Sequence, residues 1–443
     1  MPKAWRRFIP VLLGALALVL SGCAMLPNDE TLYSLPKLPD EYESLETLID
    51  QLLAGGAEYA APTSGSNLQS VQMVDLDGDG VEEAMAFLRK PNDEKPMKIY
   101  VFRAVGESYE QYCVIEGTSN SIYSINYTDV NGDGWREILS GSRGNLDVQN
   151  LTVYSIAGGE PQQLLVTGYS RYAVRDLDDD GRQDLVVIRS DEENAATADY
   201  YAWNGAEIEL YNSLRLSSSI AELSRLTAGT LAGGENALFV TGVAEESISI
   251  TDILAVREGK LQSVTHGSLS ERGGEVYHFL GLYPGDVDGD GVTEVPDPVA
   301  YPRRDAEGAD YYRICWRQFD GSGRSSIVCQ NYQSTQDGWS LILPESWGSG
   351  VTVERTAASD SSAVVFSRWN GLSAESDPFL TIYTYTGISR DTQATRSGRF
   401  LLRREADVVY AAELTDGALG MIDEQTLRDS FDRITAEWTT GEN

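Results

Sequence analysis

Histidine and positive charge are both scarce in this sequence. The two histidines are His266 and His278, so a metal centre or catalytic triad that depends on imidazole has little to draw on. Lysine and arginine total 34 residues against 68 aspartates and glutamates, which gives a formal net charge of −34 at pH 7. Such a surface repels phosphate groups, and this argues against nucleic acid or anionic lipid as a direct ligand.

Catalytic sequence signatures are missing as well. The chain has no G-x-S-x-G nucleophile elbow, no H-E-x-x-H zinc motif, no P-loop and no G-x-G-x-x-G dinucleotide fingerprint. Hydrophobic residues make up 42% of the 443 residues, which is enough for folded cores in two or three domains. The composition therefore indicates a folded, acidic protein without a recognisable catalytic motif.

An aspartate-rich loop of nine residues occurs four times. The pattern D-x-[DN]-x-D-G-x-x-[DE] begins at Asp75, Asp129, Asp176 and Asp286. Ca²⁺ takes six to eight oxygen ligands, which side chains at positions 1, 3, 5 and 9 and the carbonyl at position 7 would supply. The glycine at position 6 lets the backbone wrap the ion. We predict up to four structural Ca²⁺ sites, with these ligands: Asp75, Asp77, Asp79, Val81, Glu83; Asp129, Asn131, Asp133, Trp135, Glu137; Asp176, Asp178, Asp180, Arg182, Asp184; Asp286, Asp288, Asp290, Val292, Glu294.

The last acidic position separates two families of calcium loop. An EF-hand carries a glutamate at position 12, but that position holds Ala86, Ser140, Val187 and Asp297 here. Position 9 is acidic in all four loops, and this pattern resembles the calcium hairpins of FG-GAP/VCBS repeats in integrin-type β-propellers. The resemblance implies calcium binding and a propeller scaffold, but no particular ligand. The alternative is that the Asp-Gly pairs only mark polar turns.

The loops recur at the spacing of propeller blades. Their first aspartates are separated by 54 residues (75 to 129), 47 (129 to 176) and 110 (176 to 286). The last interval spans two repeats and contains a glycine-rich copy without carboxylates, residues 228–234, followed by the strand-like segment 237–240. Periods of this length built from short strands are typical of blades. We therefore expect a mainly β fold, with a β-propeller of five or more blades and calcium-binding hairpin loops over residues 57–335.

The first residues resemble the leader of a bacterial lipoprotein. Lys3, Arg6 and Arg7 precede the apolar run 8–20, as in an export signal. The segment Leu20-Ser21-Gly22-Cys23 resembles a lipobox, which implies a signal peptide over residues 1–22 and lipidation of Cys23. Residues 23–40 read as a proline-containing tether and residues 41–56 as one amphipathic helix. The expected location is extracytoplasmic, lipid-anchored to a bacterial membrane.

The repeat pattern stops near residue 336. Strands are expected at 351–354, 363–367, 379–385, 398–402 and 408–414, followed by a helix from Asp423 to Trp438. This order favours a small α+β C-terminal domain over residues 336–443. A sixth blade is the alternative, because residues 337–339 repeat the Asp-Gly-Trp of 133–135. Cys315 and Cys329 flank a turn, so a disulfide and two free thiols both remain open, with Cys113 unpaired.

These features together predict a surface-anchored, calcium-binding module. The membrane partner is reached through the lipid on Cys23, and a further extracellular protein or glycan partner is expected but not identified. No transmembrane segment follows Cys23, so a relay across the membrane is not favoured. The alternative function is a polysaccharide lyase or hydrolase that uses an acidic pair on the propeller, although every prominent carboxylate cluster already belongs to a calcium loop.

Overall fold

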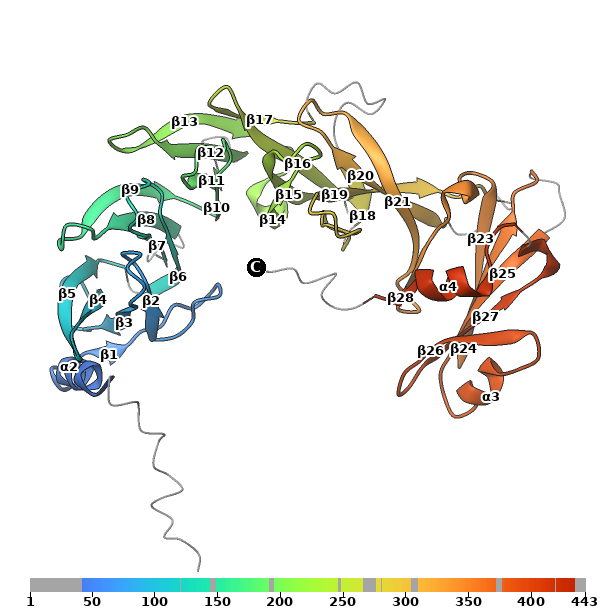
Figure 1. Ribbon diagram of the computed structural model, residues 1–443, viewed down its shortest axis with the longest axis horizontal. Coiled ribbons are helices and arrows are strands. Elements are labelled where there is room, and N and C mark those ends of the chain that lie inside the picture. The colour runs from blue at the N-terminus through green and yellow to red at the C-terminus, as the bar shows by residue number, and fades with distance from the viewer. Residues whose placement is uncertain are drawn as a thin grey trace, which may run out of the picture.

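The computed structural model describes residues 42–119, 121–143, 149–190, 195–245, 248–265, 276–279, 281–303, 310–371, 377–418 and 420–434. The expected signal peptide, Cys23 and the tether lie outside these residues. The described chain is mainly β and forms six antiparallel sheets that follow one another along an open arc (Figure 1). Three helices accompany them in this part: α2 (Glu43–Ala54), α3 (Arg390–Ala394) and α4 (Glu424–Ser430).

The sheets are numbered here in chain order. The first three contain β1 (Glu58–Tyr59), β2 (Val71–Val74), β3 (Glu83–Arg89), β4 (Met97–Val105) and β5 (Ser108–Gly117); β6 (Ser121–Thr128), β7 (Glu137–Arg143), β8 (Gln149–Ser155) and β9 (Gln162–Gly168); β10 (Arg171–Arg175), β11 (Asp184–Ser190), β12 (Ala196–Trp203) and β13 (Ile208–Arg215). The second and third are plain four-stranded meanders, whereas in the first both β1 and β2 pair with β3.

The last three sheets are five-stranded. They contain β14 (Leu223–Thr230), β15 (Asn236–Glu245), β16 (Ile248–Arg257), β17 (Lys260–Ser263) and β18 (Val276–Phe279); β19 (Glu294–Ala300), β20 (Tyr312–Phe319), β21 (Ser325–Ser334), β22 (Trp339–Ile342) and β28 (Phe431–Arg433); β23 (Val351–Ala358), β24 (Ser361–Arg368), β25 (Asp377–Tyr385), β26 (Arg399–Arg404) and β27 (Val409–Leu414). Short 3₁₀ turns lie at Ile220–Glu222, Glu345–Trp347 and Asp416–Ala418.

Successive sheets pack face to face because side chains alternate along each strand. In β11, Leu185 and Val187 join a core shared with the second sheet, whereas Val186 and Ile188 join a core shared with the fourth. Corresponding cores lie between the first and second, fourth and fifth, and fifth and sixth sheets. A strand that is apolar on both faces is thus explained by a neighbouring sheet on each side.

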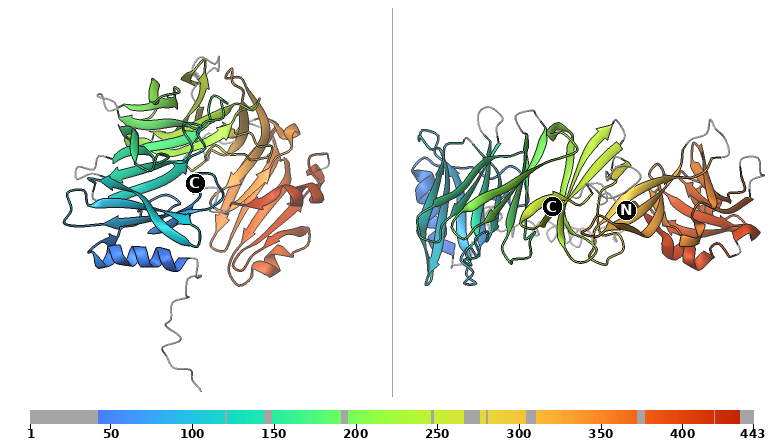
Figure 2. Two further views of the ribbon diagram at one scale, coloured as in Figure 1. Left: turned by 60° about the vertical axis from the view of Figure 1, so that its left-hand side comes forward. Right: turned by 90° about the horizontal axis from the view of Figure 1, so that it is seen from above.

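The ring expected of a propeller is not closed by the described sheets, and short helices cover both ends of the arc (Figures 1 and 2). On the outer face of the first sheet, Leu45 and Ile49 of α2 pack on Ala84, Ala86 and Leu88 of β3. At the other end, Ala394 of α3 packs on the outer face of the sixth sheet. Apolar end faces of a stacked array need such covers, and the covers occupy surface that a closing contact between first and sixth sheets would need.

The expected N-terminal helix is confirmed, with narrower bounds than 41–56. The region after residue 336 differs more from expectation. The five expected strands are present as β23 to β27, but the boundary at 336 falls inside the fifth sheet, because β22 and β28 extend that sheet beyond β21.

The predicted C-terminal helix is wrong in its extent. α4 ends at Ser430, and Phe431 begins a strand that pairs with β22 and packs on Trp339. Pairing at the free edge of the fifth sheet therefore replaces further helical turns. Trp438 lies outside the described residues.

The structure has no bond between Cys315 and Cys329, which are both free. Cys329 pairs with Trp316, and Cys315 pairs with Gln330. The two cysteines are one register position apart and point to opposite faces of the sheet, since neighbouring residues alternate. Cys113 is also free, and burial raises the pKa of its thiol to about 12.

Candidate metal-binding loops

The four acidic loops occupy equivalent places in their sheets. Loop 1 (residues 75–83) joins β2 to β3, loop 2 (129–137) joins β6 to β7, and loop 3 (176–184) joins β10 to β11. Loop 4 (286–294) leads into β19, and a bridge between Gly285 and Glu294 closes it. Each loop therefore precedes a strand that is covered on both faces, by two sheets or, for β3, by the second sheet and α2.

The acid at position 9 begins that strand and anchors the loop. Glu83, Glu137, Asp184 and Glu294 are at most 4% exposed. In each case one carboxylate oxygen accepts a hydrogen bond from the backbone N–H of position 2, at 2.8, 2.9, 2.9 and 2.8 Å in loops 1 to 4. The other oxygen accepts a side-chain hydrogen bond in two loops, from Asn131 to Glu137 at 2.9 Å and from Gln318 to Glu294 at 2.8 Å.

Glycine at position 6 is required by the backbone. Its φ lies between +85° and +90° in all four loops, a region that residues with a Cβ rarely adopt. In this conformation its N–H donates to the aspartate at position 1, at 3.2, 3.0, 2.9 and 3.0 Å. The N–H of position 7 donates to the position-5 side chain at 2.8 Å in every loop. The four loops thus share one backbone template.

Carboxylate oxygens converge in three of the loops. One oxygen from each of three residues lies within 4.8 Å of the others in three groups: Asp75, Asp77 and Glu83; Asp176, Asp178 and Asp184; Asp286, Asp288 and Asp290. In loop 2 an amide takes part instead: Nδ2 of Asn131 donates to Asp133 at 3.1 Å and to Glu137 at 2.9 Å. The ligand role of the position-7 carbonyls of Val81, Trp135, Arg182 and Val292 stays a prediction.

The buried acids carry an electrostatic cost. Burial, together with the charges of nearby aspartates in the same loops, raises the pKa of Glu137 and of Asp184 to about 7. Burial also raises the pKa of Glu83 and Glu294. Crowded carboxylates out of water disfavour their own ionised form unless a cation offsets the charge. A hard divalent cation fits this donor set, which in the three groups consists of carboxylate oxygens alone.

Consecutive loops touch one another. The N–H of Arg136 in loop 2 donates to the carbonyl of Leu76 in loop 1 at 2.7 Å, and Gln183 of loop 3 donates to Asp129 of loop 2 at 3.4 Å. Thr293 of loop 4 donates to Thr230 of the fourth sheet at 2.9 Å. These contacts therefore link the first sheet to the second, the second to the third and the fourth to the fifth.

The carboxylate-free copy lies where the spacing places it, between β14 and β15. Its turn has five residues between the strands (231–235), three fewer than the eight between β2 and β3 (75–82). The N–H of Leu231 donates to the backbone carbonyl of Glu235 at 2.8 Å, which replaces the side-chain anchor of position 9. Asn236 reaches loop 3 directly, since its Nδ2 donates to the Asp176 carbonyl at 2.8 Å and to Asp179 at 3.0 Å.

Two residues beside the loops were not found by sequence reasoning. Arg103 of β4 contacts Asp77 of loop 1, and Gln318 of β20 contacts Asp290 of loop 4. Each stands on the strand that pairs with the strand following the loop, more than 20 residues from its partner. Only the pairing register shows that they face the acidic loops.

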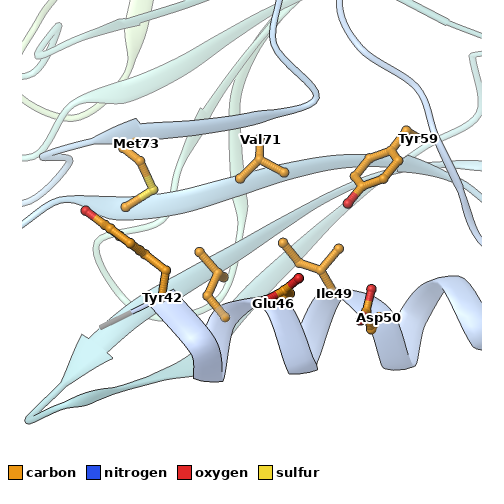
Figure 3. Close-up of a pocket in the computed structure, with 8 residues that line it drawn as sticks. Tyr42, Glu46, Ile49, Asp50, Tyr59, Val71 and Met73 are labelled. Atoms are coloured by element: carbon orange, nitrogen blue, oxygen red, sulfur yellow. The ribbon is translucent and has the colours of Figure 1, made fainter. Parts of the chain in front are cut away.

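Two cavities lie away from the loops. The first, about 480 Å³, is an apolar groove in which Met73, Val71 and Tyr59 of the first sheet face α2 (Figure 3). Its two carboxylates, Glu46 and Asp50, are exposed on the helix. The second, about 440 Å³, lies between the first and second sheets, and its one carboxylate, Glu116, is paired with Lys98. Neither cavity presents a buried pair of acids.

Comparisons with known proteins identify no family. No protein-family model matches the chain, and no curated protein matches it. Among solved structures, a periplasmic gluconolactonase of Pseudomonas aeruginosa is similar, with 11% identity and a TM-score of 0.29 over 72% of this chain and 86% of that one. A likeness this weak assigns neither a fold nor an activity. Among the described helices, none is long and apolar enough to cross a membrane.

Proposed function

We propose that the protein is a lipid-anchored, calcium-binding relative of FG-GAP/VCBS propellers that serves as a binding module outside the cytoplasm. The observation that carries the calcium assignment is the shared template of the four loops. Four separate segments adopt the same hydrogen-bonding pattern, and in three of them carboxylate oxygens converge. Simple polar turns do not require a buried acid at position 9.

Calcium suits this donor set better than the common alternatives. Zinc prefers nitrogen and sulfur ligands, and the three convergent groups consist of aspartate and glutamate only. Magnesium demands a small, regular octahedron, whereas calcium tolerates the larger and more flexible set that a nine-residue loop offers. The side chains of positions 1, 3, 5 and 9 would hold the ion, and its charge would stabilise their ionised form.

The role proposed for the ion is structural. Each loop precedes a buried strand and hydrogen-bonds to the neighbouring loop or sheet, as Arg136 does with Leu76 and Thr293 with Thr230. An ion that fixes one loop therefore also fixes a contact between two sheets. No step of a reaction needs to be assigned to it.

The proposed lipid anchor and extracytoplasmic location are inferred from the first 23 residues of the sequence. The basic residues, the apolar run and the segment ending in Cys23 support export and lipidation. Millimolar calcium outside cells would then be available to loops that bind with modest affinity. The acidic surface agrees with attachment through the lipid rather than through anionic headgroups.

Binding rather than catalysis is favoured by where the acids lie. The three carboxylate groups that converge among the described residues belong to the loops, and neither of the two cavities described above holds a buried pair of acids such as a glycosidase uses. A glycan or protein ligand remains the expected partner. The test is to incubate the mature protein with a panel of polysaccharides: sustained product release that depends on acids outside the loops would overturn the binding-module assignment.

The calcium assignment has a direct test. Elemental analysis and calorimetric titration of the mature chain should detect Ca²⁺, up to four ions per molecule. Glu294→Ala should remove one site, whereas Ala228→Ser, an exposed change next to the carboxylate-free turn, should remove none. Stoichiometric zinc, or no ion in any loop at millimolar calcium, would refute the assignment.

A further inference from the structure

The residue that pairs across the sheet with the position-9 acid differs among the loops. Glu294 of loop 4 pairs directly with Gln318. The registers of the other sheets, with Ala84 opposite Phe102, Ile138 opposite Tyr154 and Leu185 opposite Tyr201, place three residues at the matching position: Arg103 in loop 1, Ser155 in loop 2 and Ala202 in loop 3. Only loop 1 has a fixed positive charge there.

Arg103 is held over the centre of loop 1. Its guanidinium contacts Asp77, whose side chain is 5% exposed and belongs to the convergent group of that loop. The same guanidinium lies 5.5 Å from the ring of Tyr112 and 5.8 Å from the ring of Trp135, and these rings stack on each other. Cation–π contacts with the two rings favour this placement, so they hold the guanidinium beside Asp77.

Gln318 makes the matching contact in loop 4 without charge. Its Nε2 donates to Asp290 at 2.7 Å and to Glu294 at 2.8 Å. A side-chain amide can turn over and offer its oxygen to an incoming cation, but a guanidinium has donors only and no acceptor. Calcium could therefore share loop 4 with Gln318, whereas it must displace or repel Arg103 in loop 1.

We propose that Arg103 is a built-in counter-cation that competes with Ca²⁺ for loop 1, so that loop 1 binds calcium most weakly and keeps its shape when calcium is scarce. This inference rests on the proposed calcium function. The charge on Arg103 stabilises the same ionised carboxylates that an ion would stabilise. The first sheet, at the end of the arc, then depends least on calcium.

The arginine of loop 3 does not play the same part. Arg182 contacts Asp180, whose side chain is 33% exposed against 5% for Asp77, while the two arginine side chains are exposed alike, at 41% and 38%. Asp180 is also outside the convergent group of that loop, which consists of Asp176, Asp178 and Asp184. A water-exposed ion pair contributes little and is easily exchanged, so loop 3 should bind calcium more tightly than loop 1.

A reciprocal exchange tests the proposal. Calcium titration by calorimetry is carried out on the full mature chain and on Arg103→Gln, Gln318→Arg and Arg103→Lys, with circular dichroism to verify folding. Arg103→Gln should strengthen one weak site by about tenfold, and Gln318→Arg should weaken one tight site by a similar factor. Arg103→Lys keeps the charge and should stay weak. Adding Asp75→Ala to Arg103→Gln should abolish the gain, which assigns it to loop 1.

Hydrogen exchange in EGTA supplies a readout independent of binding. Backbone amides of loop 1 should be more protected than those of loop 4 in the wild type, and Arg103→Gln should remove that difference. Wild-type protein that binds no Ca²⁺ overturns this inference together with the calcium function. Wild-type protein that binds Ca²⁺, with titrations unchanged by Arg103→Gln and Gln318→Arg, overturns only the role of Arg103.

Discussion

One buried carboxylate, Asp337, links the fifth and sixth sheets beside the apolar core that they share. It lies between β21 and β22 and accepts two hydrogen bonds from Arg355 of β23, at 2.7 and 2.9 Å. Ser334 and Ser362 each donate to it at 2.6 Å. The side chains of Asp337 and Arg355 are 5% and 19% exposed. Asp337→Ala would therefore leave a largely buried guanidinium without its counter-charge.

The expected loss is large for a single substitution. Removing one partner of a buried ion pair costs about 3–5 kcal/mol, because the remaining charge stays desolvated. Because the Arg355 side chain remains partly exposed, we expect Asp337→Ala to lower the free energy of unfolding by about 3 kcal/mol, the lower end of this range. Replacing both residues, in Asp337→Ala with Arg355→Met, should recover most of this loss, since no charge is then buried. Glu58→Ala removes an exposed pair with Arg89 and should cost less than about 1 kcal/mol.

Urea unfolding followed by tryptophan fluorescence measures these changes. Trp339 and Trp347 lie in the core between the two sheets, so the probe reports on the contact concerned. Burial alone would raise the pKa of Asp337, but hydrogen bonds from Arg355, Ser334 and Ser362 hold it below its ordinary value. The ion pair therefore contributes above about pH 4 and is lost as pH falls through the lowered pKa. An Asp337→Ala protein within about 1 kcal/mol of wild type at pH 7 would refute the reasoning.

Three further predictions concern the ion, a histidine and the anchor. If calcium is present at about ten times each dissociation constant, each occupied loop adds ~1.4 kcal/mol to the free energy of unfolding. EGTA should therefore destabilise the chain by ~4–6 kcal/mol in thermal unfolding. An unfolding curve that EGTA does not change would mean that the loops are plain turns. Burial lowers the pKa of His278 from 6.5 to about 4. The neutral imidazole therefore favours the folded state above pH 6.5, and this stability is lost as pH falls towards 4. Between pH 7 and 5 the free energy of unfolding should fall by ~2 kcal/mol more in the wild type than in His278→Gln. Cys23→Ala should abolish fatty-acid labelling in cells while Cys113→Ala retains it, and labelling that persists without Cys23 would contradict the lipobox.

Features with a local signature were predictable from sequence. The loops repeat within nine residues, and the structure gives them one template. The buried strands that follow them, such as β11, are apolar on both faces, and α2 carries a continuous stripe from Leu45 to Leu53. In these segments local pattern and tertiary packing require the same residues.

Features that depend on distant partners were not predictable. The sixth sheet has no acidic loop, because β23 and β24 are joined by the tight turn at Ser359 and Asp360. The helical pattern expected from Asp423 to Trp438 gave no sign that a sheet edge was available to pair with Phe431. Cys315 and Cys329 look symmetric about their turn, and only the register places them on opposite faces. Closure of the ring could not be judged without knowing that α2 and α3 cover the end faces.

At three sheet-to-sheet contacts an arginine joins groups on the two sheets without an ion. Between the first and second sheets, Arg103 connects Asp77 to the ring of Trp135. At the carboxylate-free turn, Arg175 of the third sheet donates to Asn236 of the fourth at 2.6 Å. Between the fifth and sixth sheets, Arg355 pairs with Asp337.

An arginine carries its charge at all calcium concentrations, whereas a loop ion does not. Calcium depletion should therefore loosen loops 2, 3 and 4 first. The two ends of the arc would stay attached to their neighbouring sheets through Arg103 and Arg355. In an open arc the end sheets have only one sheet as neighbour, so a contact independent of calcium matters most at those two places.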